Sequence, residues 1–356
     1  MSDHPYRNLP AASFWKRSVA EVPADKVDPV VRGKFHINQM DRVATAGSCF
    51  AQHIARHLAM SGFNYFVSER ENPVIPGNLA AEYGYGLFTA RYGNIYTSRQ
   101  LLQLLKRAYG LFQPVEDVWH KKNGSLVDPY RPQIQPDGFA SLAEYLADRQ
   151  QHFAAVRRAI EELDVFVFTL GLTETWASEE DGSVYPVCPG VAGGTFDERR
   201  HRFVNLTVAE VCADLREAIE FIRVRNPASR FILTVSPVPL VATAADRSVI
   251  VSTTYSKSVL RVAAQEIADK DENIAYFPSY EIITGQHARG KYFAADLRSV
   301  TEEGVSRVME LFMQHYAQAV PEAPPVRKDS QAMSSEQEIA IGEAIAVMCD
   351  EEALDR

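Results

Sequence analysis

The stretch that most constrains the fold is a short strand that turns through a glycine into a helix. Residues 40–46 predict a buried strand, Gly47 permits a sharp backbone turn, and residues 49–60 place apolar side chains at helical spacing. Ser48 therefore stands at the start of the helix, where unpaired N–H groups and the helix dipole favour developing negative charge. A nucleophilic serine would gain from both effects, whereas the simpler alternative is that Ser48 only caps the helix.

Composition and charge exclude several classes of protein. The chain has 356 residues, 46% of them hydrophobic, so it can bury a sizeable core. Its net charge of -9 and dispersed basic residues argue against a nucleic-acid surface. It has no run of about 18 apolar residues and no signal-peptide core, so we expect no membrane span and a cytoplasmic location. The cysteines form neither a CxxC pair nor a disulfide framework, and we expect free thiols at Cys49, Cys188, Cys212 and Cys349.

The alternation of apolar runs and helical periodicity predicts an α/β fold. Residues 164–170 form an apolar run of the length expected for a central parallel strand. The same pattern predicts further strands at 63–68, 230–235 and 273–277, and helices at 97–108, 141–163, 207–224, 256–269 and 301–316. We expect a three-layer α/β/α sandwich with a mostly parallel sheet. Ligands bind beyond the carboxyl ends of such strands, where Ser48 and residues 171–174 both lie.

The chain is predicted to hold one main domain and a separate tail. Residues 1–320 form the domain, with an N-terminal arm on its surface that Phe14 and Trp15 anchor. Residues 111–138 are predicted to form a small hairpin over the site. A linker rich in Pro, Ser and charge follows at 321–336, and a C-terminal helical tail at 337–356.

Several motifs of the chain together resemble those of a known family. The five residues from Gly47 to Ala51 read Gly-Ser-Cys-Phe-Ala, and further motifs lie at residues 92–96, 168–174, 235–239 and 255–257 and in the region of Asp296. This set resembles the motifs of the GSCFA family, whose signature the first five residues spell. The resemblance covers about residues 30–317. This family looks related to the SGNH (GDSL-like) esterases and acyltransferases, which have a flavodoxin-like α/β/α fold and carry a nucleophilic serine in their first sequence block.

The resemblance implies a nucleophile and an oxyanion hole. Ser48 matches the nucleophile. Gly93 matches the glycine of the second block, whose N–H serves the oxyanion hole, although a turn glycine is the alternative. Thr173 occupies the position of the superfamily's asparagine, and its hydroxyl is a less directional donor.

Three further residues are predicted to bind substrate. Asn94 follows the glycine of the second block, and Glu174 takes the final acid position of the third. We expect Glu174 to orient Arg91 or Lys257, or to hold a substrate hydroxyl. Lys257 is predicted to close the site, with Ser256 as the N-cap of its helix.

The base is the point at which this sequence departs from its relatives. Asp296 matches the aspartate of the last block, but Ser299 stands where Asp-x-x-His would place the histidine. His287, nine residues before Asp296, is the substitute that we predict. Cys49 is a rival nucleophile, because a thiol at the first helical position has a lowered pKa.

The sequence thus predicts a serine esterase or O-acyltransferase that acts on acyl esters of carbohydrates or similar small hydroxylated molecules. The alternative is a catalytically inactive carbohydrate-binding or assembly protein that kept the fold and lost its base. No cofactor is expected. A metal is not expected either, because His53 and His57, at i and i+4, have no evident third ligand.

Overall fold

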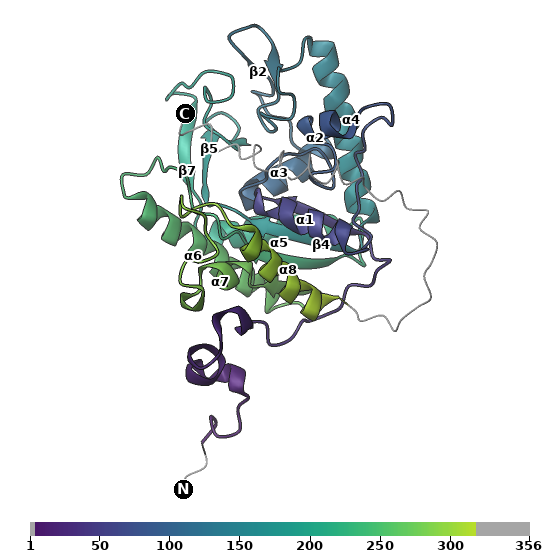
Figure 1. Cartoon of the computed structure of the whole chain (residues 1–356). Helices are drawn as coiled ribbons and strands as arrows, with labels where there is room; N and C mark the ends of the chain where they lie inside the picture. Colours follow the sequence, from purple (N-terminus) through teal and green to yellow (C-terminus); the bar gives the residue numbers. More distant parts are fainter. Residues whose placement is uncertain (1–3, 318–356) are drawn as a thin grey trace.

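A four-stranded parallel sheet forms the centre of the molecule (Figure 1). The computed structural model describes residues 4–317. The strands lie in the order β1-β4-β8-β9, and every neighbouring pair is parallel. Their bounds are Val43–Gly47 for β1, Val165–Leu170 for β4, Arg230–Val235 for β8 and Ile274–Phe277 for β9. The predicted central strand is therefore confirmed, and Gly47 at the end of β1 pairs with Thr169 of β4.

Helices cover both faces of the sheet. Because successive residues of each strand point to opposite faces, each strand contributes side chains to two hydrophobic cores. On β4, Phe166 and Phe168 belong to one hydrophobic core, and Val165 and Val167 to a second. The first core contains residues of α3 (Ser98–Ala108), α4 (Leu142–Glu162), α5 (Val208–Arg223) and α6 (Val249–Ala268). The second contains residues of α1 (Phe50–Met60), α7 (Ser279–Thr284) and α8 (Glu302–Tyr316). The predicted three-layer α/β/α sandwich is confirmed.

Side-chain caps start most of the helices where the sequence predicted them. Thr97, Ser141, Thr207 and Thr301 each accept a hydrogen bond from a backbone N–H of the first turn that follows. The helix predicted from residue 256 is the exception. It begins at Val249 with Ser248 as its cap, so Ser256 lies inside the helix.

One strand prediction needs correction, and one sheet was missed. Residues 63–68 form no strand: Tyr65 makes only an isolated parallel bridge to Val43. A second sheet was not predicted. It is antiparallel, in the order β6-β5-β7, with bounds Glu174–Ser178 for β5, Val184–Tyr185 for β6 and His201–Asn205 for β7. The hairpin expected within residues 111–138 is present as β2 (Trp119–His120) and β3 (Leu126–Val127).

The later residues of the N-terminal arm hold it to the body. Its first part projects (Figure 1), where Phe14 is half-buried and Trp15 is 63% exposed, so Trp15 does not anchor it. Val27, Val30 and Ile37 are buried instead, and the Ile37 N–H donates a hydrogen bond to the carbonyl oxygen of Tyr316. The predicted linker and tail lie outside the described residues. Between residues 4 and 317, every helix is too short or too polar to cross a membrane.

Candidate functional site

The turn between β1 and α1 requires a glycine. Gly47 has φ +139°, in the region that side chains disfavour, and it lies against β4. A methyl group on Gly47 would lie 2.8 Å from the Cβ of Thr169 and would overlap its carbonyl oxygen. The Gly47 carbonyl oxygen accepts a hydrogen bond of 2.8 Å from the Ile95 N–H. The segment around Ile95 is thereby fixed beside the turn.

Ser48 is buried at this turn with an unused hydroxyl. Its side chain is 3% exposed, and its Oγ has no hydrogen-bond partner among residues 4–317. Its own N–H donates to the carbonyl oxygen of Thr169 at 3.2 Å. Gly171 packs so closely that a methyl group on it would lie 3.0 Å from the Ser48 Cβ. The structure therefore brings Ser48 and the segment that follows β4 together, as expected from their places at the ends of neighbouring parallel strands.

Two residues of α6 hold the segment after β4 in place. Lys257 is 1% exposed, and its Nζ donates a 2.7 Å hydrogen bond to the carbonyl oxygen of Gly171. The Thr173 N–H donates to Ser256 Oγ at 3.0 Å, and the Thr173 hydroxyl donates to Asn205 Oδ1 at 2.6 Å. The hydroxyl predicted to serve the oxyanion thus has its single proton directed to Asn205. Lys257 lies inside the fold, where it positions the main chain beside Ser48.

The predicted second block lies next to the start of α1. Gly93 has φ +65° with open space around its Cα, so it adopts a turn conformation that favours glycine. Asn94 is buried, and its Oδ1 accepts a 3.3 Å hydrogen bond from Gln52 Nε2. Gln52 lies in the first turn of α1, and its Oε1 has no hydrogen-bond partner in the part of the chain that the structure describes. The sequence analysis missed Gln52, because one glutamine inside an amphipathic helix gives no signal of its own.

Glu174 orients neither of the residues expected. Its Oε1 accepts a 2.8 Å hydrogen bond from Thr243 Oγ1, and burial raises the pKa of Glu174. Lys257 binds Gly171, and Arg91 pairs with Asp148. The reason is that Glu174 begins β5, the strand that the sequence did not predict.

Asp296 and His287 are not brought to Ser48. Asp296 is exposed and accepts hydrogen bonds from Ser299 Oγ at 2.6 Å and from the Ser299 N–H at 2.9 Å, which lowers its pKa. His287 lies on the 3-10 turn Gln286–Ala288, where burial, and then Arg307, lower its pKa. Because Ser48 Oγ has no partner within the described residues, a hydrogen-bonded triad is not assembled in this conformation.

Helix α1 and the residue before it also carry the rival nucleophile Cys49 and the two histidines considered as metal ligands, His53 and His57. Cys49 precedes the helix and is half-buried. His53 lies on α1 and is half-buried, and burial, and then Arg56, lower its pKa to about 4. His57 Nδ1 lies 3.1 Å from the carbonyl oxygen of His53. Neither histidine belongs to a cluster of three metal-ligating side chains in the described part of the chain.

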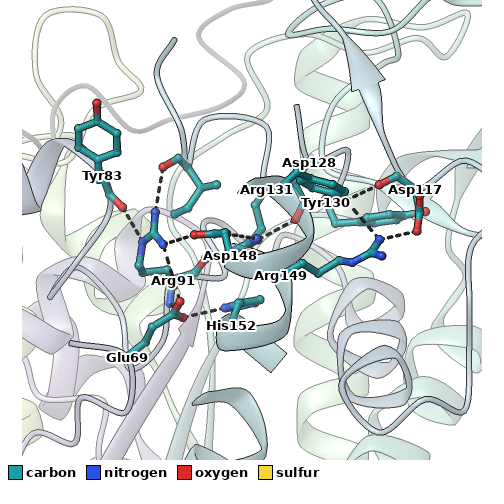
Figure 2. Close-up of polar contacts among 12 residues, drawn as sticks. Glu69, Tyr83, Arg91, Asp117, Asp128, Tyr130, Arg131, Asp148, Arg149 and His152 are labelled. Carbon is teal, nitrogen blue, oxygen red and sulfur yellow. Dashed lines mark hydrogen bonds and ion pairs between the residues drawn. The ribbon is translucent and has the colours of Figure 1, made fainter. Parts of the chain in front are cut away.

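A buried chain of charged residues was also missed by the sequence analysis. Figure 2 shows Asp148 of α4 between two arginines, with Oδ1 2.6 Å from Arg91 Nη1 and Oδ2 2.7 Å from Arg131 Nη2. Burial acts to raise the pKa of Asp148, but Arg131 and Arg91 outweigh it and lower that pKa. Glu69 accepts from the Arg91 N–H at 2.7 Å and lies 2.7 Å from His152 Nδ1. These residues come from four separate segments, so no local sequence pattern predicts that they meet.

Comparison with known proteins places the chain in a family. None of the curated proteins compared with it matches. A family model described as the GSCFA family matches residues 42–312, which include the Gly47 turn, Ser48, Lys257 and Asp296. The match spans well over half of the 356 residues. The chain therefore belongs to the GSCFA family.

Proposed function

We propose that this protein is a serine esterase or O-acyltransferase of the SGNH type, acting on acyl esters of carbohydrates or similar small hydroxylated molecules. The observation that carries the proposal is the buried Ser48 hydroxyl, which has no hydrogen-bond partner within the described residues. Leaving a buried hydroxyl unpaired costs about 1–3 kcal/mol. That cost is understandable where a substrate and a base complete the hydrogen bonds of the group during the reaction.

Ser48 would act as the nucleophile of a two-step acyl transfer. Its Oγ forms a bond to the acyl carbon while the ester C–O bond breaks, and the hydroxyl proton passes through the base to the departing alcohol. Water or an acceptor hydroxyl then attacks the acyl-enzyme, and Ser48 Oγ leaves with a proton. Since Ser48 is 3% exposed, the chain around it must move before an ester can reach it.

In this proposal the base and the oxyanion donors reach their working positions only when substrate is bound. His287 remains the predicted base and Asp296 its acid, and Gly93 and Thr173 the predicted oxyanion donors. Catalytic hydrogen bonds are often long or broken in ligand-free enzymes and tighten in the complex, so the present separation does not remove these residues from the reaction. Asn94, Glu174 and Lys257 remain proposed for substrate binding, Lys257 through its hold on Gly171.

A second candidate is a carbohydrate-binding or assembly protein without catalysis. The arrangement of Asp296 supports it, because Ser299 stands at the position of the missing histidine and takes both oxygens of the carboxylate by its N–H and hydroxyl. In that case the fold serves binding alone.

The discriminating experiment is turnover of a panel of acetyl esters by the full chain, compared with the variants Ser48→Ala and Cys49→Ala. Neighbouring positions make these variants a matched pair. We expect the first substitution to abolish turnover and the second to keep it. No turnover by the unmodified chain on any ester of the panel would favour the binding protein, and turnover by Ser48→Ala would refute the assignment of the nucleophile.

A further inference from the structure

A cavity opens between α2 (Gly77–Glu82), the loops that follow it and the first half of α4. Its volume is about 440 Å³, within the range of small-molecule sites. The aromatic residues Tyr83, Tyr85 and Phe139 line it. Gln135 and Gln151 line it as well. Such a lining combines flat apolar faces with groups that both donate and accept hydrogen bonds.

Arg91 fixes one wall of this cavity. Its guanidinium is buried, donates to the carbonyl oxygen of Tyr83 at 2.8 Å and pairs with Asp148. Its central carbon lies 4.2 Å from the centre of the Tyr85 ring. One side chain thus connects both tyrosine positions of the wall to α4 (Figure 2 shows Tyr83, Arg91 and Asp148).

Asp148 extends this connection to the loop on the other side. Its second oxygen binds Arg131, which in turn donates to Asp128 Oδ2 at 2.8 Å. Burying such groups is costly unless they are paired, and the paired arginines and carboxylates hold their elements in one arrangement. The loops that carry Tyr83 and Tyr85 are therefore fixed to α4 before any ligand arrives. A preformed site loses less entropy on binding.

The charges around the cavity disfavour an anionic ligand. Arg91 is neutralised by Asp148 at 2.6 Å, so no uncompensated cation faces an anionic group. Glu144 is the other charged residue of the lining, and its Oε2 accepts a hydrogen bond from the Ala140 N–H at 2.9 Å. The remaining polar residues of the lining are Gln135, Gln151, Tyr83 and Tyr85. Aromatic faces for C–H surfaces and amides for hydroxyls match the chemistry of a sugar ring.

We propose that this cavity binds a neutral sugar unit of the substrate, with a ring face against the tyrosines and hydroxyls on the glutamine amides. The identification of the sugar as part of a substrate rests on the function proposed above. Arg91 and Ile95 are four residues apart, so their Cα atoms lie within about 14 Å. Ile95 binds the Gly47 turn, so the segment that carries Arg91 connects the wall of the cavity to the turn of Ser48.

The test uses the full chain carrying Ser48→Ala, so that binding is measured without turnover. Cellobiose, xylobiose and maltose are the neutral probes, glucosamine and glucuronic acid are the charged comparators, and saturation-transfer NMR with calorimetry is the readout. Ala147→Trp fills the cavity from an exposed position of its lining. Ala154→Trp, two turns later on α4 and also exposed, is the control.

We expect at least one neutral disaccharide to bind and to lose about tenfold or more in affinity in Ala147→Trp, with Ala154→Trp unchanged. Binding of none of the neutral probes, equal binding by both variants, or a preference for the charged sugars would overturn the inference. The outcome is separable from catalysis. Sugar binding without any esterase turnover would reject only the enzymatic proposal, and turnover without sugar binding would reject only this site.

Discussion

Replacing Gly47 by alanine should reveal how strictly the Ser48 turn is built. The backbone has φ +139°, which costs a residue with a side chain about 1–3 kcal/mol. The added methyl group would also lie 2.8 Å from Thr169 Cβ and overlap the Thr169 carbonyl oxygen, and overpacking costs about another 1–3 kcal/mol. We therefore expect Gly47→Ala to lower the free energy of unfolding by about 4 kcal/mol. Urea unfolding followed by circular dichroism measures it.

Gly93→Ala provides the matched control for this substitution. Gly93 also has a positive φ, of +65°, but no atom lies near the place of the new methyl group. Only the backbone cost of about 1–2 kcal/mol applies there. If Gly47→Ala lost no more stability than Gly93→Ala, the close packing of the turn on β4 would not be the reason for the glycine, and the argument for a rigid turn would be refuted.

Two other sites give predictions of different kinds. Asp148→Asn leaves one acceptor oxygen where Arg91 and Arg131 each use one, so we expect a loss of about 2–3 kcal/mol in the same urea experiment, and an unchanged midpoint would contradict the network. If His287 is the base, turnover rises with pH as it loses its proton, and the midpoint lies below the ordinary value of about 6.5 because burial lowers its pKa. A kcat/KM profile of His287→Ala should lack this acidic limb, whereas an unchanged profile would reject the histidine. Ser299→His is expected to raise turnover by restoring the Asp-x-x-His spacing, and no gain would indicate that the loop no longer faces Ser48.

Strong local signals predicted the sheet and most helices. The apolar run that became β4 has few alternatives once it must be buried on both faces, and Thr97, Ser141, Thr207 and Thr301 mark helix starts because each satisfies an unpaired N–H.

The start of α6 was predicted too late in the sequence, and the reason is local. Its first turns, from Val249, contain Ile250, Val251, Thr253 and Thr254, whose branched side chains disfavour a helix by propensity, and tertiary packing overrode that preference. The antiparallel strands β5, β6 and β7 were not predicted, for another reason. β6 has only two residues, and β5 pairs with β7 across the long connection between Ser178 and His201.

Only one part of the candidate site was predictable: the carboxyl ends of neighbouring parallel strands lie side by side, so the residues that follow them meet. That rule correctly joined Ser48 with the segment of Gly171, and the contact of Lys257 with that segment follows from packing that the sequence does not display. The spacing of Asp296 and Ser299 places them in one turn but does not say where the turn faces. In the structure the Asp296 carboxylate is exposed and accepts the N–H groups of its own turn.

The most direct test of Ser48 as the nucleophile is to identify the residue that a fluorophosphonate modifies. The full chain and its Ser48→Ala variant are incubated with the reagent, and the modified peptide is located by mass spectrometry after digestion. An active nucleophile at the turn predicts one adduct, on Ser48, in the unmodified chain and none in the variant. An adduct that persists in Ser48→Ala, or that maps to another residue of the unmodified chain, would contradict the assignment of Ser48 as the nucleophile.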